Sequence, residues 1–136
     1  MGIRFAYFSG VREQITPELV ERSSPHAIGG PEPSVILGQL GEQLTGVSFL
    51  EIGEAVKTWR GRHGWSVYIE ELDDRMRDAL ATVQPDDYRP TAERWSTIEE
   101  LAAWPADEVS AVLESLCTLA RDAVGRGHHL YCWVML

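Results

Sequence analysis

The densest group of chemically versatile side chains in this 136-residue sequence lies between positions 59 and 65. It contains two tryptophans, two arginines and a histidine, which are Trp59, Arg60, Arg62, His63 and Trp65. Indole rings can form the walls of a pocket, a guanidinium can hold an anionic group, and an imidazole can move a proton near neutral pH. The same residues also suit a helix C-terminus, where cationic side chains are favoured and tryptophans can face the core. This structural role is the simpler interpretation.

Two neighbouring histidines, His128 and His129, lie at the entrance to the last predicted strand. Successive strand residues point to opposite faces, so this pair cannot bind one metal ion together, and no metal site is predicted. A capping or hydrogen-bonding role is the expected one.

One hypothesis joins these two groups into a small-molecule site between residues 59–65 and 128–133, beside the Pro/Gly-rich loop around Gly29 and Gly30. Its tryptophans would form the walls, Arg60 or Arg62 would hold an anion, His129 would contribute to the lining, and His63 or His128 would exchange a proton.

The sequence carries no established catalytic signature. It lacks a phosphate-binding glycine loop, a Gly-x-Ser-x-Gly turn and a His-Glu-x-x-His pair, so no cofactor is expected and an enzymatic activity stays an open question. Cys117 and Cys132 are not arranged as Cys-x-x-Cys, and their apolar surroundings predict free, buried thiols.

The net charge of −9 is concentrated in the second half of the chain. Residues 1–69 hold seven acids and six bases, whereas residues 70–136 hold fourteen acids and six bases. This balance disfavours nucleic acid as a partner. The leading hypothesis is a non-enzymatic binding protein, an immunity-type or regulatory partner, whose acidic half meets a basic protein. The simpler alternative is that acidic helix faces only maintain solubility.

Hydrophobic periodicity predicts a single α+β domain over residues 1–136, with helices packed on a small sheet. Strands are expected at 3–8 and 129–135, and helices near 52–63, 65–83 and 106–124. The last strand is apolar on both faces, which predicts an interior position in the sheet. A short helix is expected from Thr16-Pro17, another from a Ser34 cap, and a third from the Ser96/Glu99 capping box, with loops at 23–33 and 84–94.

No apolar run reaches the roughly 20 residues needed to span a membrane, and no signal peptide is recognisable, so a soluble cytoplasmic protein is expected.

Three segments resemble the YfbM-like family of small, functionally uncharacterised bacterial proteins. They are Met1-Gly2-Ile3 before an aromatic strand, 50–56 followed by Trp59 and His63, and Gly127-His128-His129-Leu130 before an apolar strand. Together they cover roughly a third of the chain, and the central stretch is shorter here than in that family. The resemblance implies a single α+β domain and supplies no catalytic residues.

Overall fold

The computed structural model describes residues 2–22, 27–62 and 64–136, with the side chain of residue 65 outside this description. The strands are β1 (Arg4–Gly10), β2 (Ile28–Gly29), β3 (Lys57–Gly61), β4 (Gly64–Glu71) and β5 (His129–Met135). The α-helices are α1 (Pro17–Val20), α2 (Gly38–Thr45), α3 (Phe49–Ile52), α4 (Asp74–Thr82), α5 (Tyr88–Trp95) and α6 (Ala106–Arg126). Short helical turns are η1 (Arg12–Gln14), η2 (Pro33–Leu37), η3 (Pro85–Asp87) and η4 (Glu99–Leu101).

The five strands form one antiparallel sheet in the order β2-β1-β5-β4-β3. The last strand, β5, lies at its centre, between β1 and β4, so the prediction of an interior strand is confirmed. The expected α+β class is confirmed as well, and both terminal strands belong to the same sheet.

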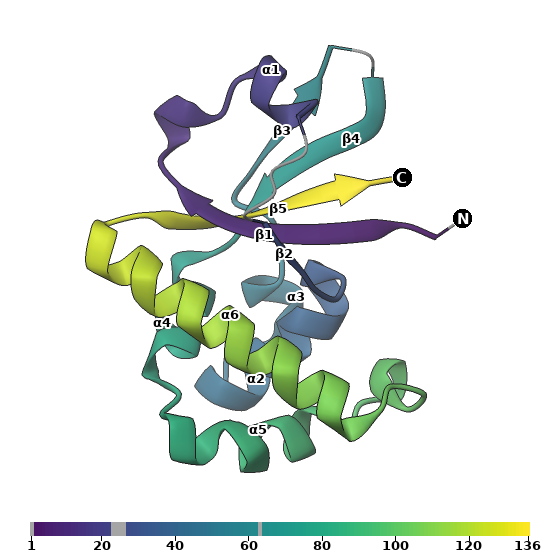
Figure 1. The fold of residues 1–136 in the computed structure, drawn as a ribbon, viewed down its shortest axis with the longest axis vertical. Coiled ribbons are helices and arrows are strands. Elements are labelled where there is room, and N and C mark those ends of the chain that lie inside the picture. The colour runs from purple at the N-terminus through teal and green to yellow at the C-terminus, as the bar shows by residue number, and fades with distance from the viewer. Residues whose placement is uncertain (1, 23–26, 63) are drawn as a thin grey trace.

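The two faces of the sheet are covered differently (Figure 1). Helices α2 to α6 pack on one face, while η1 and α1 lie across the other. The alternation of β5 matches this division, since Leu130, Cys132 and Val134 belong to the core on the helical side. On the opposite face, Tyr131 and Trp133 belong to a second apolar cluster with residues of the 12–22 segment.

The long helix α6 supplies one side of the main core, as its sequence predicts. Acidic residues in its first turn suit the helix dipole, and Gly127 ends it in the left-handed conformation with φ 68°. Its buried stripe is Val109, Leu113, Leu116, Cys117, Ala120 and Ala123. The predicted range of 106–124 is confirmed to within two residues.

The helix expected at 52–63 is wrong. Residues Phe49–Ile52 form one short helix, α3, and Lys57–Gly61 form the edge strand β3. Gly64, with a φ of 96°, belongs to the hairpin between β3 and β4. An edge strand buries little, and the sparse apolar residues Ile52, Val56 and Trp59 fit a helical spacing by coincidence.

The helix expected at 65–83 is wrong in its first half. Gly64–Glu71 is the strand β4, and the helix α4 starts after Asp73, whose carboxylate accepts a hydrogen bond from the backbone N–H of Arg75 at 2.8 Å.

The remaining differences concern helix starts. The stretch 84–94, expected to be a loop, contains most of α5. Pro90 is tolerated there because it stands in the first turn, where its missing N–H has no partner within the helix. Ser96 ends α5 rather than capping a new helix, and Glu32 rather than Ser34 caps η2. The Thr16 cap of α1 is confirmed.

Among the residues that the structure describes, every helix is too short or too polar to cross a bilayer.

Candidate functional site

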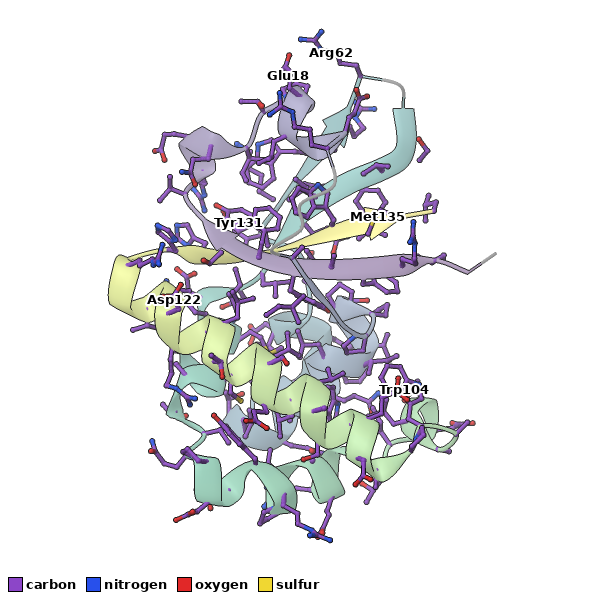
Figure 2. The ribbon with its side chains drawn as sticks, viewed as in Figure 1. Glu18, Arg62, Trp104, Asp122, Tyr131 and Met135 are labelled. Atoms are coloured by element: carbon purple, nitrogen blue, oxygen red, sulfur yellow. The ribbon has the colours of Figure 1, made fainter. Side chains whose placement is uncertain are left out.

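The β3–β4 hairpin does not gather the aromatic and cationic residues of 59–65 into one pocket. Trp59 and Arg60 are neighbours on a strand and therefore face opposite sides of the sheet. Arg62 lies at the tip of the hairpin, where it is paired with Glu18 of α1 (Figure 2). His63 and the side chain of Trp65 fall outside the described residues.

Trp59 and His129 both pack against the buried ring of Tyr131. The centroid of Tyr131 lies 5.8 Å from that of Trp59 and 6.4 Å from that of His129, both edge to face. Phe8 stacks on the same ring at 5.2 Å and contacts Trp133 at 4.2 Å. We call these five residues the Tyr131 cluster. It brings together two predicted site residues, Trp59 and His129, with Tyr131 and Trp133 of the predicted segment 128–133, and adds Phe8, which was not predicted.

An ion pair between buried Glu71 and exposed Arg12 lies beside the Tyr131 cluster. Glu71 of β4 is 1% exposed, and its two carboxylate oxygens accept hydrogen bonds from Nε and Nη2 of Arg12 at 2.8 and 2.7 Å. Burial acts to raise the pKa of Glu71, but the Arg12 guanidinium outweighs it and the pKa is lowered. The Tyr131 hydroxyl adjoins this carboxylate without a well-formed hydrogen bond to any described residue. Burial and the charge of Glu71 raise the pKa of the Tyr131 hydroxyl.

The two neighbouring histidines have different surroundings. Nδ1 of His129 lies 2.8 Å from a carboxylate oxygen of Asp74 at the start of α4. Nδ1 of His128 lies 3.4 Å from Oγ of Ser9, and its backbone carbonyl accepts a hydrogen bond from Arg77 at 2.9 Å. Each therefore fastens the start of β5 to another element, which agrees with the expected hydrogen-bonding role.

A cleft of about 520 Å³ lies between α6 and the 12–22 segment, at the edge of β1. Phe8 and Trp133 of the Tyr131 cluster line it, together with Ser9, Gln14, Leu19, Leu119 and Asp122. Ser9 connects this cleft to His128, so one of the predicted proton-exchanging residues lies close to its rim.

Five exposed acids of the second half lie on η4 and the first half of α6, and we call them the acidic surface. The members of this acidic surface are Glu99, Glu100, Asp107, Glu108 and Glu114, all exposed, and no base occurs between positions 95 and 120. Elsewhere on the helical layer Glu93 pairs with Arg89 and Asp122 with Arg126, but in the described part of the chain no ion pair involves the acidic surface. Half-buried Trp104 lies beside it, just before α6 (Figure 2).

Both cysteines are free and buried, as predicted. Burial raises the pKa of Cys117 to about 11, and that of Cys132 is raised further. No group of three or more potential metal ligands occurs among the described residues.

Comparisons of the chain with protein-family models, curated proteins and solved structures gave no match, so the resemblance to the YfbM-like family stays a prediction.

The Glu71–Arg12 pair was missed because its partners are 59 positions apart and no local pattern connects them. The available signal was indirect: Val67, Ile69 and Glu71 alternate along one face of a strand, which makes the acid a buried residue in need of a cation.

Proposed function

We propose that this protein is a non-enzymatic binding protein, an immunity-type or regulatory partner, whose acidic surface engages a basic protein. The observation that carries the proposal is the set of five exposed acids over 99–114, a stretch of sequence that contains no base. Like charges held on one rigid face steer an oppositely charged partner and disfavour other partners.

The acidic surface also offers an apolar anchor. The indole of Trp104 is half-buried against the main core, and small side chains, Ala102, Ala103 and Ala106, are exposed around it. A tryptophan surrounded by charges has the composition found where protein interfaces concentrate their binding energy. Such a surface would act in a soluble bacterial protein of the cytoplasm, which we include in the proposal.

The test is affinity capture with the whole protein at low and high salt. A partner held by the acidic surface is retained at low salt and lost at high salt, because salt screens exposed charges. The triple variant Glu99→Lys/Glu108→Lys/Glu114→Lys should lose that partner. A control with the same change in net charge, Glu13→Lys/Glu54→Lys/Asp86→Lys, reverses exposed acids elsewhere and should keep it. Equal loss in both variants, or turnover of a metabolite without any partner, would contradict the proposal.

The alternative small-molecule function rests on a different observation. Trp59 and His129 meet at Tyr131, and His128 lies near the 520 Å³ cleft that Trp133 lines. A ligand in this cleft would change the fluorescence of Trp133. Titration against a metabolite panel should therefore give saturable quenching that His128→Ala weakens and that Arg60→Ala, on the far edge strand, leaves unchanged.

A further inference from the structure

Strand β4 carries two adjacent acids that face opposite sides of the sheet, and only one of them has a counter-charge nearby in the described part of the chain. Glu71 faces the 12–22 segment and is neutralised by Arg12. Glu70 lies on the helical side, in a cross-sheet row with Cys132 of β5 and Tyr7 of β1. Among the described residues, its partly buried carboxylate has neither a base nor a hydrogen-bond donor.

A second carboxylate, that of Glu32, approaches the same place from the start of η2. Backbone N–H groups of Ser34 and Val35 donate to its oxygens at 3.1 and 2.6 Å, which holds the side chain in position. Burial first, and then the charge of Glu32, raise the pKa of Glu70. The charge of Glu70 in turn contributes to raising the pKa of Tyr68, after burial. Glu70, Glu32 and Tyr68, which are gathered here, are thus acids or weak acids.

A cavity of about 210 Å³ opens onto these two carboxylates. Its other walls are mainly apolar and include Ile3, Phe5, Val134 and Leu136. Ile3 and Leu136 are 57% and 63% exposed, so large hydrophobic side chains stand at the mouth of the cavity. An apolar pocket with a few convergent polar groups is the usual form of a small-ligand site.

Arg4, which lies between the lining residues Ile3 and Phe5 in the sequence, does not contribute to this cavity. Arg4 belongs to β1, but it alternates with Phe5 and therefore points to the opposite face of the sheet, with Ala6 and Phe8. Arg60 of β3 lies on the helical side, opposite Tyr68 in the strand register, but only burial and the charge of Glu32 shift the pKa of Glu70, so no described base neutralises its carboxylate.

We propose that this cavity, the Glu70 cavity, binds a primary alkylammonium group. The ammonium would lie between the carboxylates of Glu70 and Glu32, where its three N–H donors meet acceptors that otherwise repel one another. Its methylene groups would cover Phe5 and Val134. A small hydrated metal ion fits less well, because apolar walls do not replace its water ligands. This proposal does not depend on the acidic surface.

The test is a titration of the whole protein, near neutral pH, followed through the backbone amide resonances of Tyr68 and Val134. n-Butylamine should give saturable shifts. n-Butanol, which has the same chain and no charge, should bind with an affinity at least about tenfold lower. Glu70→Gln should weaken butylamine binding about tenfold, since a neutral amide keeps the shape and removes the charge. Asp86→Asn, which neutralises an exposed acid of η3 outside both proposed sites, is the matched control and should leave the affinity unchanged.

A second arm identifies the source of the ammonium group. Nα-acetyl-lysine methylamide presents the same group on a peptide backbone. Binding comparable to that of butylamine would indicate a lysine side chain of another protein, whereas binding of butylamine alone would indicate a free amine. Equal binding of butylamine and butanol, unchanged affinity in Glu70→Gln, or the absence of saturable shifts would overturn the proposal. The circular dichroism of each variant verifies that it is folded.

Discussion

Replacing Trp133 by alanine should remove much of the stability that the second face of the sheet provides. Trp133 is 3% exposed, its ring contacts Phe8, and its Nε1 donates a hydrogen bond to the carbonyl oxygen of Val20 at 3.2 Å. Truncation of a buried tryptophan to alanine costs about 3–5 kcal/mol. This is a large share of a total free energy of unfolding of about 5–15 kcal/mol.

Urea denaturation of the wild-type and variant proteins measures this loss directly. For a domain of this length, 3–5 kcal/mol corresponds to a fall in the melting temperature of about 10–17 °C. Trp133→Phe separates the contributions: it keeps an aromatic ring but leaves the Val20 carbonyl without its donor, at a cost of about 1–2 kcal/mol.

The matched control is Trp59→Ala, which removes a tryptophan from the same face of the sheet. Trp59 is only partly buried on the edge strand β3, so its truncation should cost less than that of Trp133. A loss below about 1 kcal/mol in Trp133→Ala, or one no larger than in the control, would refute the argument that the 12–22 segment closes this face through Trp133.

Four further predictions concern charge, backbone space and thiols. Glu71→Gln should destabilise the protein at neutral pH. The difference in stability between the variant and the wild type should vanish as the pH falls through and below about 4.3. A lowered folded-state pKa contributes its full stability above the unfolded-state pKa, and this stability is lost as the pH falls through the folded-state pKa; melting temperatures across pH measure it. For Glu70→Gln the sign is opposite: a raised pKa penalises the folded state as the pH rises, so this variant should be more stable near neutrality. Gly53→Ala should be strongly destabilising in urea, since its Cβ would lie 2.2 Å from the Ser34 carbonyl oxygen, whereas Gly125→Ala, with no atom within 4 Å, should stabilise α6 by about 0.5–1 kcal/mol. Cys117 and Cys132 should react with a thiol reagent only after denaturation, because both are buried and their pKa values are raised.

The C-terminal third of the chain could be read from its sequence because each signal there is local. The stripe of α6, its Gly127 cap and the two apolar faces of β5 depend on neighbouring residues only. The β3–β4 hairpin could not be read in the same way. On β3 only Trp59 packs against the second apolar cluster, and β4 ends in two acids, so neither strand shows a clean alternation of apolar and polar residues.

The candidate sites depend on contacts that sequence spacing does not encode. Trp59 and His129 are 70 positions apart and meet only because β3 and β5 flank the same strand. The proposed grouping of residues 59–65 assumed a helix, which would have placed Trp59 and His63 on one face. A strand instead sends Trp59 and Arg60 to opposite faces.

The two acids of β4 show why sequence alone stops short of function in this protein. Glu70 and Glu71 are identical in type and adjacent, and both interrupt a run of strand-forming residues. The fold sends one toward Arg12, where the charge becomes part of the structure, and the other toward Glu32 and an apolar cavity without a described cation. An acid whose counter-charge lies within the protein explains stability. An acid whose counter-charge is missing from the described residues points to a ligand, and this difference appears only once the strand register assigns each side chain to its face of the sheet.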